Sequence, residues 1–285
     1  MKKLYFTLII SLFSLSLISQ GCLPEGISFS TQEEIDSFQT NYPNCTEIEG
    51  GVSIFYGENI TNLNGLSVLT SVNGYIHIEG NPELDNLTGL VSLTSIGEAL
   101  TIINSALTSL TGLESLISIG GDLRIGIAFN GWVQPNPNLS NISALENLTS
   151  IGQSLMIVEN ESLASLSGLE NLTSIGWSLA INGNSSLTSL TGLDNISAGS
   201  IGNLDIVGNE LLSTCEVQSI CDYLVSPNGN INIYSNATGC NSQTEVEEAC
   251  ETVGIQTNNF DSEFLIYPNP ATNKLFITSN NGLKI

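Results

Sequence analysis

The stretch TSIGQSLMIVENESLASLSGLENL, residues 149–172, decides the fold because close variants of it recur along the chain. Its strand segment IGQSLMI (151–157) is one of seven related segments, the last of them shortened. Their first residues are 24, 24, 23, 32, 24 and 26 positions apart, at Ile48, Val72, Ile96, Ile119, Ile151, Ile175 and Ile201. A period near 24 is typical of leucine-rich repeats, in which each repeat forms one coil of a solenoid. A more divergent eighth strand is expected over 230–234.

The apolar residues of each repeat predict a shared core. Two residues such as Leu155 and Ile157 point to the same face of a strand and stack on their equivalents in the next coil. Leucines of the return segment 163–172 fill the other side of the coil, at ~1.5–3 kcal/mol per buried side chain. An asparagine ladder that hydrogen-bonds the turns is expected three residues past most strands. Its members are Asn81, Asn160, Asn184, Asn209 and Asn236, with Asn104 one place early.

The charge balance excludes one class of partner. The 285 residues hold 28 acidic and 5 basic side chains, which gives a net charge of -23. Such a chain repels phosphates and anionic lipid headgroups. We therefore expect no nucleic-acid partner.

The N-terminus predicts export. Lys2 and Lys3 precede an apolar run over 4–18, and Ser19-Gln20-Gly21 forms a small-residue cleavage site, which together are typical of a secretory signal peptide. A membrane anchor is the alternative, but the run falls short of the ~20 residues that span a bilayer. Lipidation of Cys22 is a second alternative, and it is disfavoured because Ser19 stands where a lipobox has an aliphatic residue. We expect no transmembrane segment after cleavage.

Six cysteines lie near the two ends of the repeat region, which indicates disulfides in an oxidising compartment. A bridge between Cys22 and Cys45 would contribute roughly 3 kcal/mol. The last four cysteines allow three pairings. We favour Cys215 with Cys240 and Cys221 with Cys250. Zinc is the alternative, disfavoured because Cys215 and Cys221 are too far apart for the usual ligand spacing and the single histidine is distant in sequence.

Both ends of the repeat region contain helical patterns. Thr31 and Glu34 form a capping box before the apolar pair Ile35 and Phe38, which predicts a helix within 30–45. Amphipathic helices are expected over 215–224 and 243–250. Terminal coils expose their core edge, so these helices are expected to cover it.

The phrase TSIGxxLxIxxNxxLxxLxGLExL, flanked by these cysteine-bearing segments, resembles the receptor L-domain-like leucine-rich repeats over residues 22–250. That family occurs in growth-factor receptor ectodomains and in secreted proteins of Bacteroidetes-type bacteria. The resemblance implies a mainly β fold: a right-handed leucine-rich-repeat-like solenoid with helical, disulfide-bonded N- and C-terminal caps. It implies no fixed set of ligand-binding residues, because such domains bind different partners.

A second resemblance lies in the tail. YPNPATNKLFI (267–277) is similar to the opening of the C-terminal sorting domain of type IX secretion cargo, through Tyr267, Pro268, Asn269 and Pro270. A proline turn before an edge strand is the alternative. The family domain continues for several more strands, so a truncated start of it is expected here. The resemblance implies contact with the type IX secretion machinery and a location outside the cell or on its outer surface.

Together these patterns predict the organisation of the chain. The expected parts are a signal peptide (1–21), an N-terminal cap (22–47), a solenoid of about seven coils (48–212), a C-terminal cap with the last strand (213–251), a linker (252–263) and the truncated start of the sorting domain (264–285).

Two outward rows of the strands carry the candidate ligand residues. The central row is Ser53, His77, Thr101, Arg124, Met156, Ala180, Asp205 and Asn232. The next row, more apolar than a solvated face requires, is Phe55, Glu79, Ile103, Gly126, Val158, Asn182, Val207 and Tyr234. The fourth repeat adds AFNGWVQPNPNL (128–139), an insertion that exposes Trp132. The predicted ligand-binding residues are Phe55, His77, Ile103, Arg124, Trp132, Met156 and Val158. Packing beside the turns is the alternative for the apolar members, and packing over its own coil for Trp132.

Catalytic patterns are absent from the sequence. No GxSxG, HExxH, Walker or EF-hand motif occurs, and the central row shows no acid or base beside a complementary partner. The acids are scattered, so no metal or cofactor is indicated. We therefore expect a non-enzymatic recognition or adhesion module that binds an extracellular protein or glycan through its solenoid face. The alternatives are a carbohydrate-active enzyme and a passive structural or ice-binding envelope protein, the latter suggested by rows such as Thr149/Ser150 and Thr173/Ser174.

Overall fold

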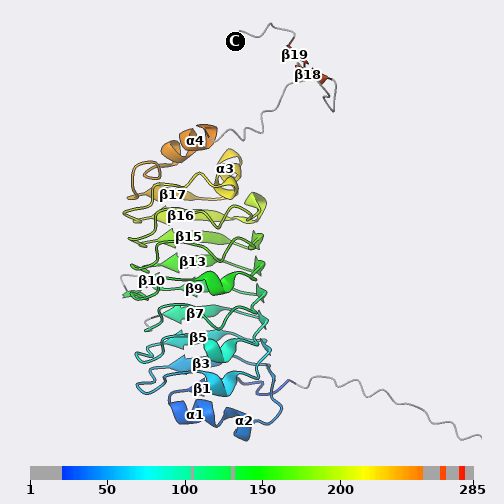
Figure 1. Ribbon diagram of the computed structural model, residues 1–285, viewed down its shortest axis with the longest axis vertical. Helices are drawn as coiled ribbons and strands as arrows, with labels where there is room; N and C mark the ends of the chain where they lie inside the picture. Colours follow the sequence, from blue (N-terminus) through cyan, green and yellow to red (C-terminus); the bar gives the residue numbers. More distant parts are fainter. Residues whose placement is uncertain (1–20, 104–105, 130–131, 253–263, 268–275, 280–285) are drawn as a thin grey trace, which may run out of the picture.

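The computed structural model describes residues 21–103, 106–129, 132–252, 264–267 and 276–279. Within these residues the fold is mainly β and is built on two parallel sheets, with strands stacked along the long axis of the molecule (Figure 1). The larger sheet has nine strands, which follow one another in chain order. They are β1 (Ile27–Phe29), β3 (Val52–Phe55), β5 (Ile76–Glu79), β7 (Leu100–Ile103), β9 (Leu123–Ile125), β13 (Leu155–Val158), β15 (Ser178–Asn182), β16 (Asn203–Val207) and β17 (Ile231–Tyr234).

The smaller sheet has six strands of two residues each. They are β2 (Glu47–Ile48), β4 (Ser71–Val72), β6 (Ser95–Ile96), β8 (Ser118–Ile119), β12 (Ser150–Ile151) and β14 (Ser174–Ile175). Six of the seven segments that the sequence predicts as single strands are therefore two strands each, such as β12 and β13, which belong to different sheets. The seventh segment, 201–206, contributes one strand, β16. The glycine between β12 and β13 permits the corner: a β-carbon on Gly152 would lie 2.0 Å from the carbonyl oxygen of Gly120 in the preceding coil. Only glycine allows the stacked corners to approach so closely.

The core is the stack of inward side chains from each coil. In the coil of β13, leucines of the strand and of the return segment are all 0 % exposed: Leu155, Leu163, Leu166, Leu169 and Leu172. Short 3-10 helices shape four of the return segments, namely η1 (Asn64–Leu66), η2 (Thr88–Leu90), η3 (Ser143–Leu145) and η4 (Ala198–Ser200). Equivalent residues are Cα partners across neighbouring strands, as Leu155 is with Leu123 and Leu179. Each coil therefore buries its apolar residues against the next coil.

A ladder of buried asparagines lies just past the carboxyl ends of the strands of the large sheet. Asn160 donates from Nδ2 to the carbonyl of Ile125 (2.9 Å), and Asn184 repeats this bond on Ile157 (2.8 Å). Asn104, predicted as a ladder member one place early, lies outside the described residues. The structure adds Asn136, which is fully buried and donates to Ile102 O (2.9 Å). Asn136 lies near the end of the inserted stretch 128–139, so it is far from β9 in sequence although it takes its place in the ladder beside Asn160 (3.1 Å).

The N-terminal end carries two short helices, α1 (Gln32–Asp36) and α2 (Phe38–Asn41), where the sequence predicts one. The break falls at Ser37, while Ile35 and Phe38 on either side of it are both buried. The predicted capping box is present, because Thr31 and Glu34 exchange hydrogen bonds between side chain and backbone. A disulfide joins Cys22, just before β1, to Cys45.

The C-terminal end of the sheet carries α3 (Gln218–Val225) and α4 (Gln243–Thr252), on either side of β17 in the sequence. Figure 1 shows both helices at the end of the stack opposite α1 and α2. Disulfides join Cys215 to Cys240 and Cys221 to Cys250, the two pairs that the sequence analysis favours. All six cysteines are therefore paired.

The insertion after β9 forms a hairpin, where the sequence analysis expects an exposed loop. β10 (Ile127–Phe129) pairs antiparallel with β11 (Trp132–Gln134). A second antiparallel pair, β18 (Phe264–Tyr267) with β19 (Phe276–Ser279), lies in the tail. Pro268, Asn269 and Pro270 of the predicted sorting motif, like the predicted signal peptide up to residue 20, lie outside the described residues. No helix in the described parts of the chain is long and apolar enough to cross a membrane.

Candidate functional site

The outer face of the large sheet carries the central row in the register that the sequence predicts. His77 pairs with Ser53 and Thr101, and Arg124 pairs with Thr101 and Met156. Parallel strands lie about 4.8 Å apart, so His77 and Arg124, two strands apart, are separated by roughly 10 Å along the sheet. These two are the only histidine, lysine or arginine residues among the residues that the structure describes. In a chain of net charge -23, both therefore lie on one half of one face.

His77 lies between an aromatic ring and a carboxylate. The Phe55 ring meets the imidazole edge to face, with ring centroids 4.7 Å apart. Nε2 of His77 lies 3.3 Å from Oε2 of Glu79 without forming a hydrogen bond. Burial lowers the pKa of His77, Glu79 opposes the lowering, and the charge of Arg124 adds to it. His77 is therefore held mainly as the neutral imidazole at neutral pH.

Glu79 is the centre of a polar cluster beside His77. Its side chain is nearly buried, and its Oε1 accepts hydrogen bonds from the Tyr56 hydroxyl and from Nε2 of Gln134 (3.2 Å). The bond to Glu79 raises the pKa of Tyr56. Gln134 ends β11, so the hairpin reaches from β9 back across β7 to a residue of β5. The insertion is thereby fastened to the outer face by a buried carboxylate.

Arg124 is paired within its own strand segment. Its guanidinium contacts Oδ2 of Asp122, and the backbone N–H of Ser154 donates to Oδ1 of Asp122 (2.7 Å). Asp122 is 7 % exposed, and its hydrogen bond from Ser154 in the next coil holds the Arg124–Asp122 pair in place. This contradicts the expectation that the central row has no charged residue next to a complementary partner. The physical reason is that residues i and i+2 of a strand share a face, so partners lie along the strand as well as across it.

A groove of about 530 Å³ runs over the outer face between β5 and β9, bounded by His77, Asp122 and Arg124. Tyr75 lines one side of it, and Glu98 and Gln153 line other parts. Its small residues, which leave the space open, are Gly97, Ala99, Gly120 and Gly121. Tyr75 is not among the residues predicted from the sequence, although the alternation of the strand places it on the face of His77, two residues later. Asp122 was not predicted as a partner of Arg124, and Glu79 was predicted only as a member of the apolar row.

Of the remaining predicted ligand residues, some are buried and one is partly exposed. Ile103 is 3 % and Val158 8 % exposed, so neither offers the apolar surface that the sequence analysis expects. Ile103 lies in β7 in register with Glu79, which accepts the hydrogen bond from Gln134. β10 lies against β13, which holds Val158. Met156 is partly exposed beside Arg124. Trp132 belongs to β11, and its side chain lies outside what the structure describes.

The other half of the face is acidic. Glu159, Glu161, Asp205 and Glu210 line one depression of about 590 Å³, so these acids are less scattered than the sequence suggests. Burial and the neighbouring Glu161 raise the pKa of Glu159. Asp205 accepts a hydrogen bond from Asn232 Nδ2 (2.6 Å). Within the described ranges no group of three or more histidine, cysteine, aspartate or glutamate side chains could hold a metal ion.

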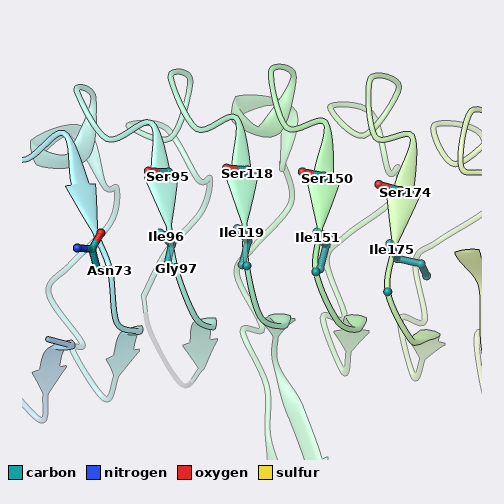
Figure 2. A pocket seen from close by; sticks show the side chains of 13 residues that line it. Asn73, Ser95, Ile96, Gly97, Ser118, Ile119, Ser150, Ile151, Ser174 and Ile175 are labelled. Carbon is teal, nitrogen blue, oxygen red and sulfur yellow. The ribbon is translucent and has the colours of Figure 1, made fainter. Parts of the chain in front are cut away.

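The small sheet presents a row of serines. Ser95, Ser118, Ser150 and Ser174 are neighbours in register, and Figure 2 shows their side chains pointing the same way along a shallow groove. The threonines beside them use their hydroxyls internally, as Thr173 Oγ1 donates to the carbonyl of Thr149 (3.1 Å). The row is a regular polar surface whose spacing is set by the strands.

The outer-face groove can bind and orient a ligand. It combines an exposed aromatic ring with hydrogen-bond donors and acceptors that are held by neighbouring residues. No family model matches the chain, and no curated protein matches it. Any functional conclusion therefore depends on the geometry of the face itself.

Proposed function

We propose that the protein is a secreted or cell-surface recognition and adhesion module. In this proposal the two parallel sheets form a right-handed leucine-rich-repeat-like solenoid of the receptor L-domain type. The helices at its ends act as disulfide-bonded caps. The module binds an extracellular protein or glycan through the outer face of the large sheet, and it is not an enzyme.

One observation carries this proposal, namely the groove between β5 and β9. The chain places its only described arginine and its only histidine there. Asp122 holds the Arg124 guanidinium, and His77 lies beside Glu79 without a hydrogen bond to it. The rigid stack beneath the groove fixes these side chains, and pre-organised contacts are what a recognition site needs. The paired cysteines favour an oxidising compartment. Export through a signal peptide and the type IX machinery of a Bacteroidetes-type bacterium is part of the same proposal, supported by the sequence resemblance alone.

The proposal is tested by blocking the groove without removing any of its contacts. Purified protein is screened on arrays of extracellular glycans and matrix proteins, beside an Ala99→Trp variant. Ala99 lines the groove, so an indole there would fill it. The matched control is Ala180→Trp, two strands beyond Arg124 in the central row.

Binding that is lost in Ala99→Trp and kept in Ala180→Trp supports the proposal. Binding that survives in both variants would place the ligand elsewhere on the molecule. An array without any ligand for the folded, disulfide-bonded protein would count against a recognition role.

The serine row favours a second candidate, a passive envelope or ice-binding protein. Five serines in register on consecutive short strands, Ser71 and the four above, present hydroxyls at a constant spacing. Thermal hysteresis of the purified protein measures this activity directly. A Ser118→Tyr variant, which interrupts the row, would abolish the hysteresis if the row contacts ice.

A further inference from the structure

We infer that the groove between β5 and β9 binds a neutral pyranose unit of an extracellular oligosaccharide, with the sugar ring stacked on Tyr75 and its hydroxyls bonded by Arg124, Gln153 and Glu98. This inference rests on the proposed function and names the ligand class of the same site.

Tyr75 is a fixed aromatic platform. Its side chain is 44 % exposed, although it lies at the start of a buried strand. The ring packs on the backbone of Gly51, where a β-carbon would come within 2.6 Å of Cε1. The Tyr75 hydroxyl also accepts a weak hydrogen bond from Ser53 Oγ (3.4 Å). The ring therefore has little freedom on one side, while the groove lies on its other side. A flat, held ring of this kind suits the apolar C–H face of a pyranose.

Hydrogen-bond donors and hydrogen-bond acceptors surround the rest of the groove. Arg124 uses its guanidinium on Asp122 and, among the described residues, on no other acceptor. Its remaining N–H groups are therefore free to donate. Gln153 can both donate and accept, and the Glu98 carboxylate accepts. Both side chains are exposed and line the groove. Sugar hydroxyls donate and accept at once, so they match this mixed set.

The charges of the groove favour an uncharged sugar. Arg124 is neutralised by Asp122, and Glu98 adds a negative charge that no cation among the described residues balances. An acidic polysaccharide would meet this carboxylate and a chain of net charge -23. A protein partner is disfavoured because the floor consists of glycines and Ala99, which provide no apolar anchor pocket. The two strand spacings from β5 to β9 give roughly 10 Å, wide enough for one pyranose ring.

The test is calorimetric titration of the purified protein with linear hexasaccharides. Neutral probes are the hexamers of glucose, mannose, xylose and N-acetylglucosamine, and the acidic probe is hexagalacturonate. We expect at least one neutral hexamer to bind and the acidic one not to bind. Tyr75→Ala should weaken binding by about tenfold or more, whereas Tyr75→Phe, which keeps the ring, should weaken it by at most about threefold. Arg124→Gln and Gln153→Ala should each weaken it by about threefold to tenfold.

The matched control is Tyr234→Ala. Tyr234 is 53 % exposed at the far end of the same sheet and lines the acidic depression, so its removal should not change sugar affinity. Equal melting temperatures show that the variants are folded. Weak dependence of binding on salt is expected, because a neutral ligand gains little from long-range charge.

The outcomes separate this inference from the proposed function. If only proteins or acidic glycans bind, and Ala99→Trp blocks them, the proposed function stands and the pyranose inference is wrong. If a neutral hexamer binds the Tyr75→Ala variant as well as it binds the unmodified protein, the inference that the sugar stacks on Tyr75 is wrong. If neither the hexamers nor the arrays yield a ligand, both proposals fail.

Discussion

The two sides of the nine-stranded sheet differ in how strictly they repeat. On the inner side, Leu100, Leu123, Leu155, Leu179 and Leu204 are leucines in register, each fully buried. On the outer side, the next residues are Thr101, Arg124, Met156, Ala180 and Asp205, with no two alike. The same backbone therefore carries a uniform layer and a variable one.

This difference separates stability from recognition. A stack of coils requires the same shape from every repeat, so the inner positions converge on leucine and isoleucine. The outer positions do not have to fit against the buried side chains of the next coil, so their residue types are free to vary. They group the histidine and arginine over β5–β9 and several acids over β13–β17. The predictions below test whether the two layers have these separate roles.

The largest effect is expected from Leu155→Ala on the inner side. Leu155 is fully buried, and its truncation leaves a cavity between two coils, so unfolding should become easier by about 2–5 kcal/mol. Met156→Ala, one residue away and partly exposed, should cost less than about 1 kcal/mol. Urea denaturation of the disulfide-bonded protein measures both. Similar midpoints for the two variants would overturn the assignment of sides.

A smaller loss is expected from Asn160→Ala in the ladder. Nδ2 of Asn160 bonds the carbonyls of Ile125 (2.9 Å) and Val158 (3.1 Å), and both bonds are buried. Removing the donor leaves these acceptors without it, at a cost of about 1–3 kcal/mol. Asn171→Ala is the control, because Asn171 is exposed and donates one bond, to Glu146 O. If Asn171→Ala loses as much stability as Asn160→Ala, burial does not determine how much the ladder hydrogen bonds contribute to the free energy of unfolding.

The inner layer could be predicted from the sequence because its signal repeats. Alternating Leu and Ile at a period near 24 determine the strands, their register and the buried side. Even Asn136, which the sequence analysis missed, carries a signal: it precedes Asn160 by 24 residues, as Asn160 precedes Asn184. Counting 24 residues back from Asn160 gives Asn136. Counting forward from the repeats that precede the insertion does not give Asn136, because the insertion changes the spacing.

The outer site was harder to predict because its residues do not repeat. The sequence placed His77 and Arg124 on one face, but their partners Glu79 and Asp122 are neighbours within the strand, and a search across strands overlooks them. The hydrogen bond from Gln134 to Glu79 joins positions 55 residues apart, and Gln134 belongs to the inserted hairpin. Such a contact leaves no periodic pattern in the sequence, and the burial of Ile103 (3 % exposed) was not predicted either.

On the outer layer, Glu159→Gln should give a small gain that depends on pH. The pKa of Glu159 is raised in the fold by burial and by Glu161, so the folded protein favours the protonated acid. The charged form therefore destabilises the fold fully above the raised pKa, and this penalty disappears as the pH falls toward the value of 4.5 in the unfolded chain. The amide should raise stability at pH 7 by at most about 0.5 kcal/mol and lose its advantage at pH 4.

Thermal melts at the two pH values measure this gain. Glu58→Gln is the control, an exposed glutamate near the start of the sheet, and it should show no comparable difference. A loss of stability in Glu159→Gln at pH 7 would show that the carboxylate makes a favourable contact, and the acidic half would then be a structured site rather than a solvated surface.

The smallest effect concerns the titration of His77, which NMR can follow without ambiguity because the chain has one histidine. Burial lowers its pKa, so the midpoint should lie below 6.5. The unfolded chain then takes up the proton first, and His77 reduces stability only as the pH falls from 6.5 toward the lowered value. Arg124→Gln removes a positive charge that disfavours the imidazolium, so the midpoint should rise by a fraction of a pH unit. A midpoint at or above 6.5, or one that Arg124→Gln leaves in place, would mean that the two groups do not share one groove. The division of the outer face into two halves would then lose its main support.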